Sequence, residues 1–151
     1  MNRVFTLSEL PKITPVLMNI ITENHSVAHA TVVCLRGDLG SGKTTLTQSL
    51  AQLLGVTSSI QSPTFTILKN YTLPDSDIVP WKHLIHIDAY RLQGESELLR
   101  LNWDNYYHNP NNLIIIEWSE LVPTLIPDNA IHVQLTHINE TTRSIETTIH
   151  L

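Results

Sequence analysis

One glycine-rich stretch of the chain has the residue types and spacing that bind phosphate groups. Gly37-Asp-Leu-Gly-Ser-Gly-Lys-Thr matches the pattern G-x-x-x-x-G-K-[S/T] without a gap. In this pattern the glycines let the backbone wrap a polyphosphate with its N–H groups pointing inward, while the lysine reaches the β- and γ-oxygens and the threonine hydroxyl ligates Mg²⁺. We therefore predict an ATP·Mg²⁺ site in which Thr44 is a metal ligand. The predicted nucleotide-binding residues are Asp38, Leu39, Gly40, Ser41, Gly42, Lys43, Thr44 and Thr45.

Two acidic residues that end apolar runs could complete such a site. Asp88 ends the run Leu84–Asp88, and Glu117 ends the run Leu113–Glu117. Ligands bind at the carboxyl ends of strands in open α/β sheets, and phosphoryl chemistry needs an acid there for the metal and the attacking water. We predict that Glu117 serves Mg²⁺, directly or through water, and that Asp88 serves a metal-bound water or the nucleophile. The alternative is that each is a solvated acid that merely terminates a strand.

A threonine in the next turn is a further candidate. The turn Gln61-Ser-Pro-Thr-Phe-Thr lies between the glycine-rich stretch and the following strand. Many P-loop hydrolases keep a loop there that responds to the γ-phosphate through a threonine. Thr64 is the predicted catalytic residue of this kind, and an ordinary Ser-Pro turn is the alternative.

The elements that must position these residues alternate between strand and helix. Thr14-Pro15 predicts the start of a first helix, with threonine as N-cap and proline at the first helical position. Further helices are predicted over Thr44–Leu54, stopped by Gly55, and over Glu95–Leu101. Strands are predicted over Thr31–Arg36, Phe65–Tyr71, Leu84–Asp88, Leu113–Glu117, Ile131–Leu135 and Ser144–His150. The pattern predicts one α/β domain over residues 1–151: a three-layer P-loop NTPase sandwich with a mostly parallel central sheet and a C-terminal antiparallel strand pair.

Composition limits the compartment and the partners. The nine Lys and Arg residues are outnumbered by fourteen Asp and Glu, for a net charge of −5. Because direct nucleic-acid binding normally needs a concentrated basic surface, any contact with nucleic acid is expected to be indirect. No apolar stretch approaches the roughly 20 residues that span a bilayer. The only cysteine, Cys34, lies in an apolar run and is interpreted as a buried hydrophobic residue. We therefore expect a cytoplasmic protein without a membrane partner.

Four sequence blocks follow one another along the chain: Gly37-Asp-Leu-Gly-Ser-Gly-Lys-Thr-Thr, Ser62-Pro-Thr-Phe, His86-Ile-Asp-Ala-Tyr-Arg-Leu and Ile116-Glu-Trp-Ser-Glu. Together they resemble the bacterial TsaE family of ATPases in tRNA threonylcarbamoyladenosine biosynthesis. The resemblance covers nearly the whole chain, and the last two blocks are its most specific part. It implies an ATPase that supports turnover of the TsaD–TsaB complex, which transfers threonylcarbamoyl to adenosine 37 of tRNA, so that tRNA is met only through the complex.

The resemblance also implies roles for single residues. Lys43 and Thr44 would contact phosphate and Mg²⁺, Glu117 would be the second Mg²⁺ ligand and Asp88 a catalytic acid. Trp118 would be a packing or partner-facing aromatic residue beside the site. Since isolated P-loop switches turn over slowly, at roughly 10⁻⁴–10⁻³ s⁻¹, we expect weak basal hydrolysis that partner proteins stimulate.

Other readings of the same site remain open. The main alternative is a P-loop kinase of a small metabolite, which would need an acceptor pocket and usually an arginine-bearing lid, whereas the five arginines here are scattered. A nucleotide-gated scaffold differs from an ATPase only in degree. A GTPase is disfavoured because no N-K-x-D element follows the glycine-rich stretch. His86 alternates with Asp88 on one strand face, which suits a structural or supporting role.

Overall fold

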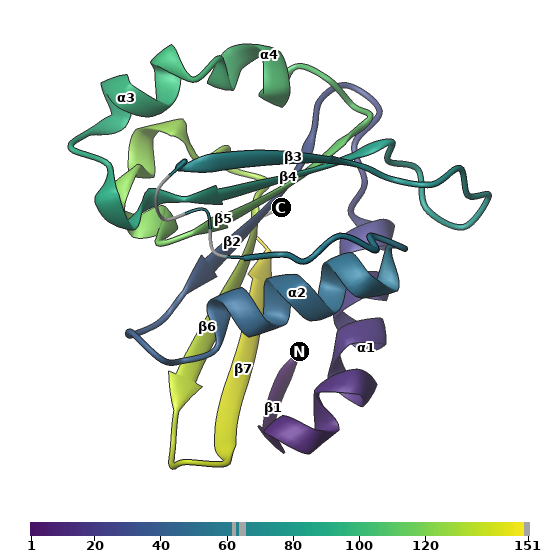
Figure 1. Cartoon of the computed structure of the whole chain (residues 1–151), viewed down its shortest axis with the longest axis vertical. Coiled ribbons are helices and arrows are strands. Elements are labelled where there is room, and N and C mark those ends of the chain that lie inside the picture. The colour runs from purple at the N-terminus through teal and green to yellow at the C-terminus, as the bar shows by residue number, and fades with distance from the viewer. Residues whose placement is uncertain (62, 64–65, 150–151) are drawn as a thin grey trace.

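The chain folds around a single sheet whose strand order is β1-β7-β6-β2-β5-β4-β3 (Figure 1). The computed structural model describes residues 1–61, 63 and 66–149. The strands are β1 (Asn2–Thr6), β2 (Thr31–Arg36), β3 (Leu68–Thr72), β4 (His83–Asp88), β5 (Asn112–Glu117), β6 (Ile131–His137) and β7 (Thr142–Ile149). The helices are α1 (Leu10–Glu23), α2 (Lys43–Leu53), α3 (Glu95–Arg100) and α4 (Trp103–Tyr107). Short 3₁₀ turns are η1 (Leu7–Glu9), η2 (Ala89–Arg91), η3 (Ser119–Leu121) and η4 (Pro123–Leu125).

The sheet is parallel at its centre and antiparallel towards both edges. Strands β6, β2, β5 and β4 are parallel neighbours, whereas β7 pairs antiparallel with β6 and β1, and β3 pairs antiparallel with β4. The mixed α/β class and the C-terminal antiparallel pair are confirmed. The prediction of a mostly parallel sheet is too strong, because three of the six pairings between described strands are antiparallel. Between β3 and β4 the chain has no crossover helix, which parallel pairing would require.

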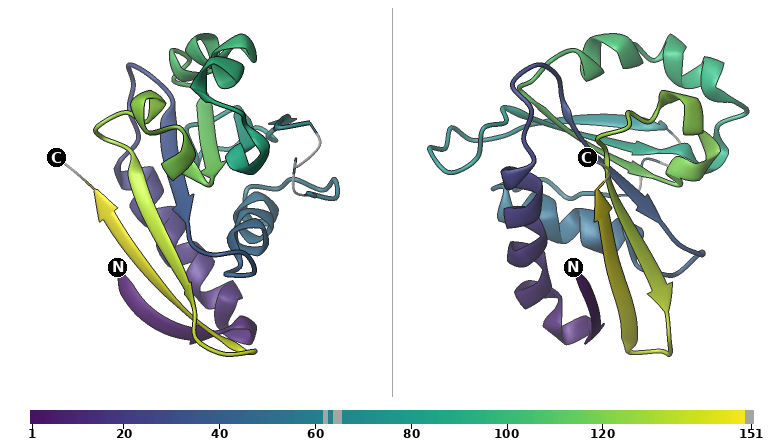
Figure 2. Two further views of the ribbon diagram at one scale, coloured as in Figure 1. Left: turned by 90° about the vertical axis from the view of Figure 1, so that its left-hand side faces the viewer. Right: turned by 180° about the vertical axis from the view of Figure 1, so that it is seen from behind.

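Helices cover both faces of the central strands. Helices α1 and α2 lie on one face and α3 and α4 on the other (Figures 1 and 2). Alternate residues of β2 follow this division: Val33 and Leu35 pack with α1 and α2, whereas Val32 and Cys34 join the cluster that contains Leu98. Burial on both faces explains why the central strands are continuous apolar runs.

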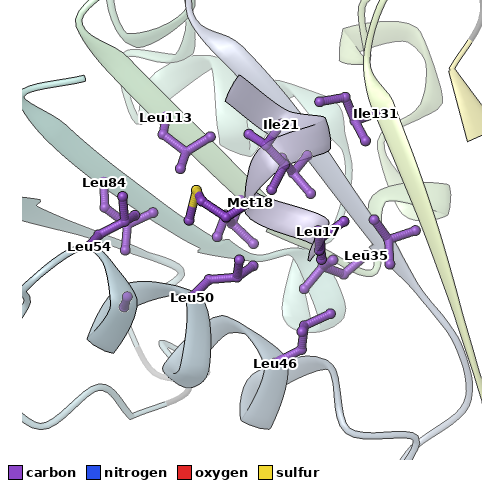
Figure 3. Packing of buried hydrophobic residues seen from close by; sticks show 14 of the residues in the cluster. Leu17, Met18, Ile21, Leu35, Leu46, Leu50, Leu54, Leu84, Leu113 and Ile131 are labelled. Atoms are coloured by element: carbon purple, nitrogen blue, oxygen red, sulfur yellow. The ribbon is translucent and has the colours of Figure 1, made fainter. Parts of the chain in front are cut away.

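The core on the α1–α2 face fixes the position of the helix that follows the glycine-rich stretch. In Figure 3, side chains of α2 and the residue after it point toward those of α1 and toward the strands. The labelled members are Leu17, Met18, Ile21, Leu35, Leu46, Leu50, Leu54, Leu84, Leu113 and Ile131. Leu46 and Leu50 are completely or almost completely buried. Burying each such leucine contributes about 1.5–3 kcal/mol, so α2 is anchored firmly to the sheet.

The predicted start of the first helix is wrong. Helix α1 begins at Leu10, with a proline, Pro11, in its first turn, and Pro15 lies inside it. Thr14 is therefore not an N-cap; its hydroxyl donates to the carbonyl of Leu10, at 2.9 Å. Pro11 gives the same start signal one turn earlier, and Glu9 accepts a hydrogen bond from the backbone N–H of Thr6 just before it.

Other elements agree with the expectations to within a few residues or were not predicted. The stop at Gly55 is confirmed by its φ of +83° after α2. The strand predicted over Phe65–Tyr71 is β3, which begins at Leu68; Phe65 lies outside the described residues. Strand β1 and helix α4 were not predicted. Cys34 is buried, and burial raises the pKa of its thiol to about 12, as expected for a residue that packs and does not react.

The helices of the described residues are all too short or too polar to cross a bilayer.

Candidate functional site

The glycine-rich stretch forms the connection between β2 and α2 (Figure 1). Gly42 stands at the N-terminal boundary of α2 with φ +102°, a conformation that favours glycine. At position 37 a side chain would clash with its neighbours. A Cβ on Gly37 would lie 2.2 Å from the carbonyl oxygen of Leu135 in β6 and 2.7 Å from Ser41 Oγ. The start of the loop therefore lies close against β6, whereas the space beside Gly40 and Gly42 is open.

Replacing Gly37 with alanine is expected to destabilise the protein more than the same change at Gly40. Both residues have positive φ, which costs an alanine about 1–2 kcal/mol. Only at Gly37 does the new methyl group meet backbone, and such overpacking adds about 1–3 kcal/mol. Urea unfolding followed by circular dichroism measures the difference. An equal loss in the two variants would show that contact with Leu135 does not determine the choice of glycine.

Lys43 bends back over the loop that precedes it. Its Nζ donates to the carbonyl oxygens of Gly37, at 2.5 Å, and Asp38, at 3.0 Å. The ammonium group also lies 3.8 Å from the ring centroid of Trp118, within the range of a cation–π contact. The side chain is buried; burial lowers its pKa, while the carboxylate of Glu117 acts in the opposite direction. The loop thus places a desolvated positive charge beside its own backbone.

The two predicted acids stand side by side where their strands end. Asp88 of β4 and Glu117 of β5 are direct neighbours in the parallel register, and both are buried, at 5% and 2% exposure. Glu117 Oε2 accepts a hydrogen bond from Thr44 Oγ1 at 2.9 Å. Asp88 Oδ1 accepts one from the backbone N–H of Tyr90 at 3.0 Å. The structure therefore joins the start of α2 to the end of β5.

These residues surround a cavity of about 370 Å³. Its lining residues are Leu39, Gly40, Gly42, Lys43, Thr44, Thr45, Asp88, Tyr90, Glu117 and Trp118. A larger cavity, of about 530 Å³, lies beside the end of α2, but its described lining carries no ionisable side chain. The smaller cavity is the candidate site because the glycine-rich loop and Lys43 meet the two strand-end carboxylates there.

Two of the predicted residues that the structure describes, Asp38 and Ser41, are not in the lining. Asp38 is exposed and contributes its carbonyl oxygen to Lys43. Ser41 is buried, and its Oγ has no hydrogen-bond partner among the described residues. Thr64 lies outside the described residues, so its role stays a prediction.

Two aromatic residues form one wall of the cavity. Trp118 has φ +59°, and its backbone N–H donates to Leu35 in β2. Its ring lies against that of Tyr90, with 5.0 Å between centroids. Trp118 was expected beside the site from the resemblance, whereas Tyr90 was missed. The available signal was its position two residues after Asp88, on the turn that carries the chain away from the strand end.

The donor set also limits the kind of metal that could bind. Within the described part of the chain, no group of three or more His, Cys, Asp or Glu side chains is arranged to hold a metal ion. Mg²⁺ needs fewer protein ligands, since it usually keeps several waters and takes one or two carboxylates plus substrate phosphates. Thr44 and Glu117 are a donor set of that kind.

A strand, a glycine-rich loop and a helix, with two acids at adjacent strand ends, define an α/β protein with a candidate phosphate-binding site. Comparison with known families gives a more specific result. The sequence model described as "Threonylcarbamoyl adenosine biosynthesis protein TsaE" matches residues 11–145. The chain belongs to the TsaE family, as the four sequence blocks predicted.

Individual relatives and one solved structure agree with this assignment. A Bacillus subtilis (strain 168) protein named tRNA threonylcarbamoyladenosine biosynthesis protein TsaE is 38% identical over 114 residues, 76% of this chain and 66% of that protein. A Nostoc protein of the same name is 42% identical over 120 residues, 78% of this chain and 69% of that one. The chain thus spans about two thirds of the length of these relatives. The crystal structure of Bacillus subtilis YdiB is similar with a TM-score of 0.67 and 28% identity, covering 100% of this chain and 86% of that one.

Proposed function

We propose that this chain is a Mg²⁺-dependent ATPase that acts in tRNA threonylcarbamoyladenosine biosynthesis. One observation carries the proposal: the hydroxyl of Thr44, at the start of α2, donates to Glu117 at the end of β5. This contact brings a hydroxyl and a carboxylate together beside Lys43, at the helix N-terminus where phosphate groups bind. The names of the relatives supply the pathway.

Open space beside the loop and the Lys43 ammonium support binding of the ATP phosphates. No described atom lies within 4 Å of the place that a Cβ would occupy on Gly40 or Gly42, so this face of the loop is open. Backbone N–H groups of the loop and the Lys43 ammonium would bind the phosphate oxygens. We therefore propose that the fold is a three-layer P-loop NTPase sandwich.

Thr44, Glu117 and Asp88 would serve the metal ion and the attacking water. Thr44 and Glu117 would hold Mg²⁺, which when bound supplies positive charge to the phosphates. Asp88, the neighbour of Glu117 in the register, would orient the attacking water or a metal-bound water. Trp118 and Tyr90 would form an aromatic wall beside the bound phosphates.

The proposed partners are the TsaD and TsaB proteins, with tRNA met only through their complex. Hydrolysis would support turnover of that complex in the cytoplasm. The net charge of −5 suits an indirect relation to tRNA, since phosphate contacts need a basic surface. Weak basal turnover would follow because a partner must complete the site.

ATP hydrolysis by the purified protein, alone and with the cognate TsaD–TsaB complex, tests the proposal. The expected result is slow Mg²⁺-dependent release of phosphate that rises when the complex is added. If the rate of turnover does not change with the complex and instead depends on a small phosphate acceptor, the proposed function is overturned in favour of a metabolite kinase.

A further inference from the structure

A buried histidine contacts the carboxylate oxygen of Glu117 that Thr44 does not bind. His86 lies in β4, two residues before Asp88 on the same strand face, and is completely buried. Its Nε2 lies 2.8 Å from Glu117 Oε1. The proposed phosphate and metal contacts do not use this residue.

The direction of the hydrogen bond follows from the partner. A carboxylate can only accept, so Nε2 carries the proton and His86 donates. The other ring nitrogen, Nδ1, is buried and has no hydrogen-bond partner among the described residues. The contact with Glu117 is therefore the polar interaction that accounts for a histidine at this position.

A second hydroxyl lies on the same carboxylate oxygen. Thr47 is one turn after Lys43 in α2, and its Oγ1 lies 3.1 Å from the Lys43 carbonyl and 3.5 Å from Glu117 Oε1. Glu117 Oε1 thus faces His86 and Thr47, whereas Oε2 faces Thr44. The two oxygens of one carboxylate have different neighbours.

We propose that His86, assisted by Thr47, is a positioning residue that holds Glu117 Oε1 so that Oε2 is presented to Thr44 and to the metal. The inference rests on the proposed function, because it assigns one oxygen of Glu117 to Mg²⁺. A glutamate has three side-chain torsions, and an unrestrained carboxylate would have to be ordered each time an ion binds. Partners behind a metal ligand commonly change metal affinity by about 10–100-fold.

Three substitutions of His86 separate positioning from packing. His86→Gln keeps an N–H donor at nearly the place of Nε2, because its side chain follows the same path of bonds. His86→Asn carries the same amide group but is one bond too short to reach Glu117. His86→Leu removes the donor while keeping an apolar side chain of similar bulk in the buried strand.

The measurements are calorimetric titrations of ADP at a series of Mg²⁺ concentrations, the same titration in EDTA, and the melting temperature of the ligand-free protein. In the wild-type protein, Mg²⁺ is expected to tighten ADP binding. His86→Asn and His86→Leu should need about 10–100-fold more Mg²⁺ than the wild type for the same gain in ADP affinity. ADP affinity in EDTA should stay at the wild-type value, and His86→Gln should recover most of the Mg²⁺ response.

The outcomes distinguish this inference from the function on which it rests. A wild-type protein whose ADP affinity does not respond to Mg²⁺ would overturn the proposed function itself. A wild-type response that His86→Asn and His86→Leu reproduce would overturn only the positioning role. A lower melting temperature with unchanged Mg²⁺ response would do the same, since it would show that His86 supports only the fold. If His86→Leu does not fold, the His86→Gln and His86→Asn pair decides.

Discussion

Replacing Lys43 with alanine is expected to lower ATP turnover by at least about 100-fold, the usual effect of removing one charge-stabilising donor from an active site. The ammonium group is buried beside the carbonyls of Gly37 and Asp38, in the lining of the candidate cavity. The alanine variant would leave phosphate oxygens without their cation. Phosphate release at saturating ATP, together with ATP affinity by calorimetry, measures the effect.

The control for this variant is Lys12→Ala, which removes an exposed lysine from α1. It should hydrolyse ATP at the wild-type rate. Because Lys43 also ties the loop to itself, the circular dichroism spectrum and melting temperature of both variants should be compared without ligand. Wild-type turnover by a folded Lys43→Ala protein would remove the glycine-rich loop from the site.

Changing Glu117 should separate ATP binding from Mg²⁺-dependent turnover. Glu117→Ala is expected to keep most of the ATP affinity measured without metal and to lose at least about 100-fold in turnover. The phosphate contacts of the loop remain, while the carboxylate that faces Thr44 is gone. Turnover measured across a range of Mg²⁺ concentrations tests this; unchanged turnover would exclude Glu117 from the site.

Glu117→Gln is the better-matched variant for the fold. Alanine leaves Thr44 Oγ1 and His86 Nε2 without their acceptor, whereas Thr47 Oγ1 keeps the carbonyl of Lys43. A buried unpaired group costs about 1–3 kcal/mol. Glutamine has nearly the same size and keeps one acceptor oxygen, but it replaces the other oxygen with an NH₂ donor, so the charge and one acceptor are lost together. Glu23→Gln, at the exposed end of α1, is the control for loss of a carboxylate and should leave turnover unchanged.

The parts of the site that sequence alone predicts are those specified by local spacing. The glycine-rich loop depends on eight consecutive residues, so its place between a strand and a helix follows from the pattern around it. Asp88 and Glu117 were found because apolar runs mark buried parallel strands, and such strands end at the same edge of the sheet. Both inferences need no knowledge of which strand pairs with which.

What the sequence could not provide depends on contacts between distant segments. The bond between His86 and Glu117 joins residues on two strands and requires the register of β4 with β5. Strand β1 was missed because its pairing partner, β7, lies at the other end of the chain. The predicted start of α1 is one turn too late because two prolines in one segment, Pro11 and Pro15, give the same signal.

The placement of Trp118 has an optical consequence. The chain has three tryptophans, of which Trp81 and Trp103 are buried away from the candidate cavity. Trp118 alone of the three lines it, with its indole ring under the Lys43 ammonium and against Tyr90. A ligand that drew the ammonium toward itself would change the emission of one indole against a constant background from the other two. Intrinsic fluorescence in a stopped-flow instrument could therefore time the arrival and departure of a nucleotide without any attached dye.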